Sequence, residues 1–256
     1  KKNNDIAGVI MEATGGSSGT FPMFGKELKR IRKLTEEHGV VLIFDEIITG
    51  FRISPGGAQK YFDVIPDLTC LGKILCGGLP GAAVAGKKEI MEFLETKGDP
   101  TWDRYRKIRH FGTQNASPLS AAAGLATLEI ISQGEVIPKI NALAQKLREK
   151  LNEVIELHGV RSCVYGFSSI FHTLFNHNCP KRGECDYQRC DYDYRKIYDR
   201  NPLLLQQFWN ALINKGIDTM IAHGTISSAH SEEDLNRTVE AFDYAIAQTK
   251  ALGLLT

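Results

Sequence analysis

The sequence predicts an α/β protein with a mostly parallel sheet, followed by a smaller α+β domain. Three observations support this prediction: an apolar strand–helix–strand pattern, two short apolar runs that each end in an ionisable residue, and a long amphipathic helix that precedes a second group of short elements. We expect a first domain over residues 1–140, a connecting helix over 141–158 and a smaller domain over 159–256.

The strand–helix–strand pattern occupies the beginning of the chain. Residues 6–11 (IAGVIM) and 40–44 (VVLIF) are apolar runs of strand length, and we expect the second to be buried on both faces of a sheet. Between them, residues 26–38 carry apolar side chains at helical spacing and end before Gly39, as an amphipathic helix does. This order forms a βαβ unit, which requires parallel strands.

Two apolar runs then end in ionisable side chains. Asp45 follows residues 40–44, and Lys73 follows the run LTCL at 68–71. Ligands of α/β sheets bind beyond the carboxyl ends of the strands, where an acid needs a cation or hydrogen bonds to compensate its burial. An aspartate that caps a turn and a lysine that is solvated at the surface are the structural alternatives. The apolar residues around Lys73 favour a nucleophilic amine in a cleft.

A lysine and an aspartate are the two protein groups that a pyridoxal 5'-phosphate site requires. The lysine forms a Schiff base with the cofactor and moves protons, and the aspartate keeps the pyridine nitrogen protonated. Lys73 is therefore the candidate catalytic residue, and Asp45 and Lys73 are candidate cofactor-binding residues.

The segments FDEIITGFR (44–52), DLTCLGK (67–73) and CGGLPGAAVAG (76–86) resemble the class III aminotransferases in order and spacing, and the likeness continues to the C-terminal helix. Within that family the sequence is most similar to the aminomutase branch. The resemblance implies a three-layer, fold-type-I pyridoxal phosphate transferase domain with a smaller α+β C-terminal domain. We expect the large domain to be incomplete, because the family's N-terminal third, with its phosphate loop and ring-stacking aromatic residue, is not found here.

The resemblance also implies roles for further residues. Ile47 would contact one face of the cofactor ring, although it is otherwise an ordinary core residue. Ser17 falls near the place of a residue close to the ring hydroxyl, and an ordinary loop serine is the alternative. Gly112 and Thr113 match a G-T-x-x-x-x-P motif that reaches the phosphate of a neighbouring subunit, which implies a homodimer. Without the family, Thr113 would be read as a helix N-cap.

The substrate assignment rests on positions where the sequence departs from the family. Glu12 is followed by Ala13 instead of proline, and Ala222 or His223 stands where the aminomutases have a glutamate. Glu12 and His223 are candidate substrate contacts, and a structural histidine is the alternative for His223.

The resemblance implies amino-group transfer on a small amino/keto or amino/aldehyde substrate through a Lys73 Schiff base. A transaminase or racemase for a different amine is the first alternative. The second is a non-catalytic domain of the same fold that needs a partner chain to supply the missing N-terminal region.

The remaining elements follow from periodicity and capping signals. We expect helices at 87–94, 119–131, 142–158, 201–215 and 231–251, and strands at 162–165 and 169–175. The last helix begins with the capping sequence SEED.

Composition excludes several classes of function. A net charge of +1 over 256 residues gives no electrostatic reason for nucleic-acid binding or for binding to an anionic membrane. We find no apolar run of membrane-spanning length and no signal peptide. Six cysteines do not indicate a disulfide framework, so a reducing, cytoplasmic location is expected.

A cysteine-rich insertion lies near residues 176–200. Cys179, Cys185 and Cys190 stand close to His172 and His177, but their spacing differs from the short pairs of structural zinc sites. We therefore predict no metal ligand, and instead a polar excursion that contacts a partner or covers the site. An interaction module stabilised by a metal is the more distant alternative.

Overall fold

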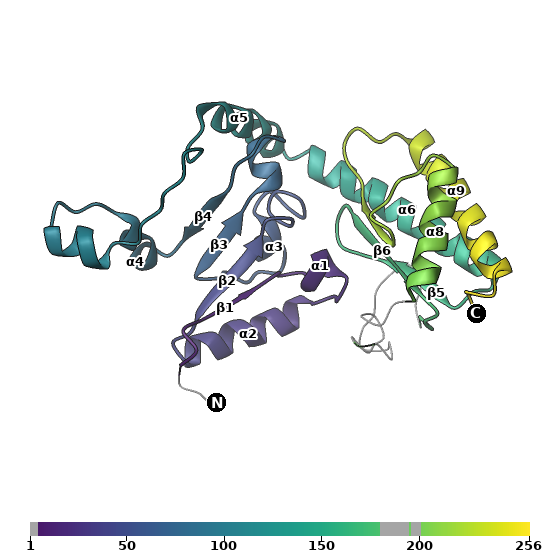
Figure 1. The fold of residues 1–256 in the computed structure, drawn as a ribbon, viewed down its shortest axis with the longest axis horizontal. Helices are drawn as coiled ribbons and strands as arrows, with labels where there is room; N and C mark the ends of the chain where they lie inside the picture. Colours follow the sequence, from purple (N-terminus) through teal and green to yellow (C-terminus); the bar gives the residue numbers. More distant parts are fainter. Residues whose placement is uncertain (1–4, 180–194, 196–200) are drawn as a thin grey trace. The chain divides into compact units, whose positions relative to one another are not determined.

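The computed structural model describes residues 5–179, 195 and 201–256. The chain divides into two compact units (Figure 1). The first unit contains Met23–Gly134 and the described residues up to Gly15, and the second contains Gly16–Pro22 and the described part of Glu135–Thr256.

A four-stranded sheet of order β1-β2-β3-β4 organises the first unit. β1 (Gly8–Met11), β2 (Val41–Glu46) and β3 (Leu68–Leu71) are parallel, and β4 (Ala83–Gly86) is antiparallel to β3. The predicted βαβ unit is present, with α2 (Gly25–Glu37) between β1 and β2. The sequence reading missed β4, because its segment AVAG has too little bulk to stand out as a strand.

Short helices complete this unit. They are α3 (Gly57–Tyr61), the 3₁₀ turn η1 (Lys73–Cys76), α4 (Lys88–Met91), η2 (Glu92–Leu94), the π-helical turn η3 (Trp102–Arg106) and α5 (Pro118–Ser132).

The core of the first unit lies on one face of the sheet. Leu42 and Phe44 of β2 are fully buried against Leu28 of α2 and Ala58 of α3. The alternate residues of β2 are only half-buried, and all four residues of β4 are exposed. The expectation that residues 40–44 are buried on both faces is therefore wrong for this chain, because α2 and α3 cover only one of them.

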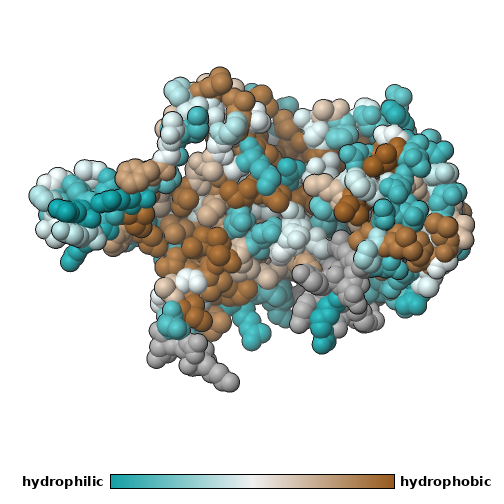
Figure 2. Space-filling model, viewed as in Figure 1, coloured by the Kyte–Doolittle hydropathy of each residue, from teal (hydrophilic) through white to brown (hydrophobic). Residues whose placement is uncertain are grey.

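The opposite face of the sheet is apolar and largely open. Register places Ile10, Ile43, Leu68 and Val84 on it, and the side chains of Ile10 and Val84 are 62% and 51% exposed. The space-filling view shows apolar surface gathered over the strands of this unit (Figure 2). A contiguous exposed apolar face of this kind marks a surface that another element covers.

Asp67 fastens the amino-terminal edge of the sheet. Its carboxylate accepts hydrogen bonds from the Leu42 N–H at 2.7 Å and from Arg32 of α2 at 3.0 Å, and it pairs with the Lys87 ammonium at 2.7 Å. Burial alone raises the pKa of Asp67, but the bonds from Lys87, Leu42 and Arg32 outweigh it and hold that pKa below its ordinary value. The single carboxylate thus ties α2, β2 and the end of β4 together.

The second unit is an antiparallel sheet covered by long helices. β5 (Ser162–Tyr165), β6 (Ile170–Phe175) and β7 (His223–Thr225) form the sheet in that order. The helices are α6 (Val136–His158), α8 (Pro202–Asn214) and α9 (Glu232–Ala251), and Ser231 and Asp234 form the predicted capping box of α9. The four-residue segment labelled α1 (Gly16–Gly19) also belongs to this unit.

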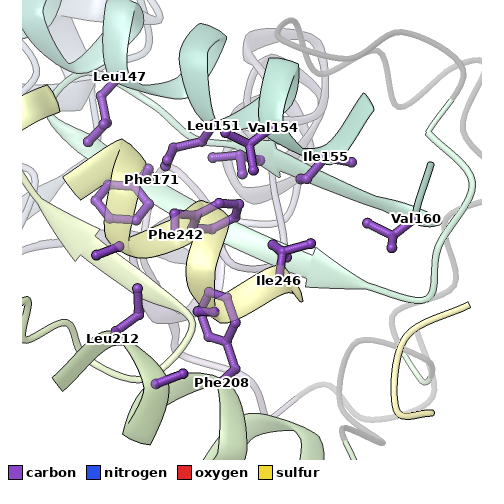
Figure 3. Close-up of a cluster of buried hydrophobic side chains, with 14 of the residues drawn as sticks. Leu147, Leu151, Val154, Ile155, Val160, Phe171, Phe208, Leu212, Phe242 and Ile246 are labelled. Atoms are coloured by element: carbon purple, nitrogen blue, oxygen red, sulfur yellow. The ribbon is translucent and has the colours of Figure 1, made fainter. Parts of the chain in front are cut away.

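Aromatic and aliphatic side chains from all three long helices meet in one core (Figure 3). Phe208 of α8 packs edge-to-face on Phe242 of α9, with ring centroids 5.4 Å apart. Leu147, Leu151 and Ile155 of α6 are fully buried in the same cluster. α6, which includes the helix expected at 142–158, thus packs into the core of the second unit.

Within the described parts of the chain, no helix combines the length and the apolar composition needed to cross a bilayer.

The Asp67 cluster predicts a measurable loss of stability. Asp67→Asn should lower the free energy of unfolding at neutral pH by about 2–3 kcal/mol, because it removes a buried charge from its two cationic partners. The folded-state pKa is depressed, so the contribution is complete above the unfolded value of about 3.9 and is lost as the pH falls through the lower folded value. Urea unfolding at neutral pH and below about pH 4 measures both effects.

Asp63→Asn is the matched control for this experiment. Asp63 also pairs with a lysine, Lys29, but its side chain is 92% exposed. Its replacement should change the free energy of unfolding by less than about 0.5 kcal/mol. Equal losses in the two variants would contradict the role given to Asp67.

Candidate functional site

Asp45 and Lys73 lie at the same edge of the sheet. In the parallel register of β2 and β3, Asp45 is opposite Cys70 and Glu46 is opposite Leu71, the last residue of β3. Lys73 follows two residues later, at the start of η1. The sheet therefore brings the predicted acid and the predicted amine to the carboxyl ends of neighbouring strands, where α/β proteins bind ligands.

The two acids that follow one another in β2 have different environments. Glu46 is fully buried, and its Oε2 accepts from the Ala58 N–H at 2.6 Å and from the Thr49 hydroxyl at 3.0 Å. Its Oε1 accepts from the backbone N–H and the side-chain amide of Gln59, at 3.0 and 3.3 Å. Both carboxylate oxygens are thus occupied by the 49–59 loop, and Glu46 is a structural residue.

The loop around Glu46 leaves no space for a side chain at Gly57. A Cβ there would lie 2.3 Å from Glu46 Oε2, and the backbone of Gly57 has a φ of +69°. Only glycine satisfies both conditions without strain. This close approach explains why α3 begins with a glycine.

Asp45 points to the open face of the sheet. Its Oδ1 accepts a hydrogen bond from the Ile47 N–H at 3.0 Å, and the carboxylate is only half-buried. Burial raises the pKa of the Cys70 thiol on the neighbouring strand, and the charge of Asp45 raises it further. Asp45 therefore presents a negative charge on the same face as Cys70, where a cationic ring nitrogen could be held.

Lys73 has an unusual backbone and an exposed side chain, and it does not line the apolar cleft of this unit, so the expectation that its apolar neighbours enclose the amine in a cleft is wrong for this chain. Its φ of +47° lies in the left-handed region, which non-glycine residues rarely occupy and which recurs at functional sites. The preceding Gly72 allows a close approach, because a Cβ there would lie 3.0 Å from Cδ1 of Ile47. Ile47 is thus packed beside the strand end that carries Lys73, as expected for a residue that contacts a planar ring.

Two glycines hold the turn that begins at Lys73. A Cβ on Gly124 of α5 would lie 2.6 Å from the Leu75 carbonyl, and one on Gly77 would lie 2.7 Å from the Ala123 carbonyl. Only glycines allow α5 to approach η1 this closely. The position of the Lys73 backbone is therefore fixed by helix packing as well as by β3.

A cleft of about 650 Å³ lies on the open face of the sheet in the first unit. Its walls are apolar apart from Cys70 and His110, and Ile47 and Val84 contribute to them. The cleft reaches the carboxyl ends of β2 and β3, where Ile47 and Leu71 line it. It is open to solvent, so another element could extend into it.

The proposed phosphate-binding residues lie outside the sheet. Gly112 and Thr113 are exposed in the segment before α5, and the Asn115 N–H bonds to the Gly112 carbonyl at 3.0 Å. The N-cap of α5 is Ser117. The alternative reading of Thr113 as an N-cap is therefore wrong, whereas its role toward a phosphate stays a prediction.

The other candidates are divided between the two units. Glu12 directly follows β1 at the carboxyl edge of the sheet. Ser17 and His223 both belong to the second unit, where Ser17 is in the left-handed turn α1 and His223 begins β7. The structure thus brings Asp45, Ile47 and Lys73 together at one edge, and the roles of Ser17 and His223 stay predictions.

Part of the cysteine-rich insertion can be placed. Cys179 is partly buried, whereas Cys185 and Cys190 lie outside the described residues. His172 is buried and uses both ring nitrogens in contacts with the Gly16–Pro22 segment. Among the residues that the structure describes, no group of three or more His, Cys, Asp or Glu side chains is arranged to hold a metal ion.

Sequence reasoning missed the residues that support the site. In the sequence, Glu46 is only the second acid of a pair, and Gly124 is one of several small residues in an apolar helix, so neither residue stands out as structural. Their roles depend on contacts with the 49–59 loop and with Leu75, which local periodicity does not report. An acid within an otherwise apolar strand was the one available signal for Glu46.

Comparisons with known proteins agree with this geometry. The family model for aminotransferase class-III matches residues 1–173. The chain is 36% identical to glutamate-1-semialdehyde 2,1-aminomutase of Methanosarcina acetivorans, covering 94% of this chain and 53% of that protein. It is 40% identical to the same enzyme of Methanothrix thermoacetophila, covering 94% of this chain and 52% of that protein. The chain therefore spans about half the length of the curated relatives it matches.

Solved structures show the same fold. An omega-transaminase from Sphaerobacter thermophilus superposes with a TM-score of 0.78 at 30% identity, covering 95% of this chain and 52% of that one. A β-phenylalanine aminotransferase from Variovorax paradoxus gives a TM-score of 0.77 at 26% identity, covering 98% and 54%. A transaminase with pyridoxal phosphate bound gives 0.78 at 25% identity, covering 98% and 54%.

The different environments of Asp45 and Glu46 predict different responses to amide substitution. Glu46→Gln should lower the free energy of unfolding by about 2–3 kcal/mol, because either orientation of the amide turns an NH₂ group toward a buried donor. Asp45→Asn should change it by less than about 1 kcal/mol, because its Oδ1 can still accept from Ile47. Urea unfolding curves of the two variants measure the difference, and equal destabilisation would show that Asp45 is also a structural residue.

Proposed function

This chain belongs to the class-III aminotransferase family, and from that premise we propose that it forms part of an enzyme that moves amino groups with pyridoxal 5'-phosphate. The observation that supports the proposal is the parallel register of β2 and β3, which brings Asp45 and Lys73 to one edge of the sheet. When bound, the cofactor supplies an aromatic ring that accepts electrons from the substrate.

The residues present fit this cofactor. Lys73 is exposed at the strand end, so its Nζ can reach the aldehyde carbon of the cofactor and can later carry a proton. Asp45 supplies the negative charge that keeps a pyridine nitrogen protonated. Ile47 supplies an apolar surface for one face of the ring, and Gly72 leaves room for Ile47 beside the lysine.

We propose that the phosphate is bound across a homodimer interface. Gly112 and Thr113 offer backbone N–H groups and a hydroxyl, and both residues are exposed in this chain. In the same proposal Ser17 bonds to the ring hydroxyl, and Glu12 and His223 contact the substrate. We also propose a cytoplasmic location, because six cysteines in 256 residues do not indicate a disulfide framework.

The substrate that we propose first is glutamate 1-semialdehyde, a small amino aldehyde. Relatives 36% and 40% identical over 94% of this chain are aminomutases for it. A transaminase for a different amine is the second candidate, because Ala222, in the region where the aminomutase branch has a glutamate, is 2% exposed and offers no polar group. Product analysis with glutamate 1-semialdehyde and with simple amino donors distinguishes the two.

We further propose that the open face and edges of the sheet are covered by the rest of the cofactor domain, either on the same polypeptide or on a second chain. The chain spans about half of its relatives, β1 and β4 are edge strands, and Ile10 and Val84 are exposed. An uncovered apolar edge strand is a site for strand addition. In this proposal a further segment completes the site.

Borohydride labelling tests the role of Lys73. The protein, purified together with its complementary N-terminal segment, is incubated with pyridoxal phosphate, reduced and digested, and the modified lysine is identified by mass spectrometry. The adduct should lie on Lys73 and be absent from Lys73→Met, while Lys60→Met, which removes another exposed lysine, should label normally. An adduct on a different lysine, or none, would contradict the proposal.

Asp45→Asn should separate cofactor attachment from catalysis. The variant keeps Lys73 and should still be labelled, but its rate of amino transfer should fall by at least about a hundredfold, because the ring nitrogen loses the charge that keeps it protonated. Single-turnover kinetics measure the rate. A variant that retains the wild-type rate would show that Asp45 does not contact the ring.

Lysine substitutions on the open face test the need for a complementary segment. Val84→Lys and Ile10→Lys should weaken association with a co-expressed N-terminal half by about tenfold or more, because each buries a charge in the apolar interface. Leu157→Lys is the control, since Leu157 is 81% exposed on the second unit. Co-purification and cofactor uptake measure association, and unchanged uptake in the Val84 variant would contradict this use of the face.

A further inference from the structure

His172 is a buried histidine that holds a loop remote in sequence. It lies in β6 and is 1% exposed. Its Nδ1 is 3.1 Å from the Thr20 hydroxyl oxygen, and its Nε2 is 3.1 Å from the Ser18 carbonyl oxygen. Both polar atoms of the ring are therefore directed at the Gly16–Pro22 segment, about 150 residues earlier in the chain.

The chemistry of these atoms fixes part of the protonation. A carbonyl oxygen only accepts hydrogen bonds, so Nε2 must carry a hydrogen that it donates to Ser18. The Thr20 hydroxyl also lies 2.9 Å from the Ser17 carbonyl, to which it can donate. If it does so, Thr20 accepts from an Nδ1–H; otherwise it turns its hydrogen to Nδ1. In either arrangement His172 binds the loop through Nε2–H.

The loop that His172 holds is in a conformation that needs support. Ser17 and Ser18 have φ of 54° and 59°, so two successive non-glycine residues are left-handed. This backbone region is unfavourable for residues with a Cβ atom, and the conformation persists only when its surroundings enforce it. Two further bonds close the turn, from the Thr20 N–H to the Ser17 carbonyl at 3.2 Å and from the Phe21 N–H to the Gly16 carbonyl at 3.3 Å.

Neighbouring rings fix the plane of the imidazole. Tyr165 of β5 and His223 of β7 lie with ring centroids 5.4 and 5.5 Å from that of His172, tilted by 30° and 25°. The Tyr165 hydroxyl also donates to the Thr20 carbonyl at 2.6 Å. The sheet of the second unit therefore presents an oriented imidazole and a phenol to one short loop.

We propose that His172 is a positioning residue, which holds the Gly16–Pro22 loop in its left-handed turn and so sets the direction of the Ser17 side chain. In the chain this loop follows β1 and precedes the segment before α2, and both the loop and His172 belong to the second unit. The contact between Ser17 and the cofactor ring rests on the function proposed above. The anchoring of the loop by His172 does not depend on that function.

Hydrogen exchange tests the anchor without cofactor. Thr20→Val removes the hydroxyl that meets Nδ1 and keeps the volume, and it should speed amide exchange at Thr20 and Phe21 by about tenfold or more, while exchange in α9 is unchanged. Thr20→Ser retains the hydroxyl and should exchange like the wild type. His172→Phe should have a larger effect than Thr20→Val, and His172→Gln should restore part of the protection. Unchanged exchange in both Thr20→Val and His172→Phe would overturn the proposal.

Nitrogen NMR gives a signature that packing alone would not produce. In the ¹⁵N-labelled protein, Nε2 of His172 should resonate as a protonated nitrogen throughout pH 6–8, and Thr20→Val should shift Nδ1 while Nε2 keeps its hydrogen. An unprotonated Nε2 would overturn the proposal, because it could not bond to Ser18. Failure of Lys73 labelling together with normal results here would reject the cofactor function and leave the loop anchor intact.

Discussion

The parallel pairing of β2 with β3 is the constraint on which the rest of the site depends. It sets Asp45 opposite Cys70, so that the strand carrying the acid and the strand leading to Lys73 end at the same edge. A slip of one residue would reverse the faces of β2. Leu42 and Phe44 would then leave the core, and Glu46 would lose its partners in the 49–59 loop. Burial of those side chains therefore fixes the register that directs Asp45 to the open face.

Different interactions stabilise the two ends of the strands in this sheet. At the amino-terminal edge Asp67 joins α2, β2 and the residue after β4 through one carboxylate. At the carboxyl edge Glu46 binds the loop before α3, and Gly124 brings α5 against the turn that starts at Lys73. The residues that we assign to chemistry make few of these contacts: Asp45 accepts from the neighbouring Ile47, and Lys73 is exposed. The residues that hold the backbone in place are thus different from the residues whose side chains remain available for chemistry, as a preorganised site requires.

Several of these features could be predicted from the sequence. Hydrophobic periodicity located the βαβ unit and most helices, the SEED sequence located the start of α9, and apolar runs placed Asp45 and Lys73 at strand ends. β4 and β7 were not predicted, because they are short and consist of small or polar residues. The contact between Thr20 and His172 was not predicted for a different reason. Its partners are 152 residues apart, and no local sequence pattern indicates such a contact. The open face of the sheet was not predicted either, because the apolar run at 40–44 does not show that only its alternate residues are buried.

The most direct test is a structure of the protein with pyridoxal phosphate bound, together with the further segment proposed above. We expect continuous density from Lys73 Nζ to the cofactor, the Asp45 carboxylate within hydrogen-bonding distance of the ring nitrogen, and Ile47 against the ring. A cofactor attached to another lysine, or a ring nitrogen that faces a residue other than Asp45, would contradict these assignments.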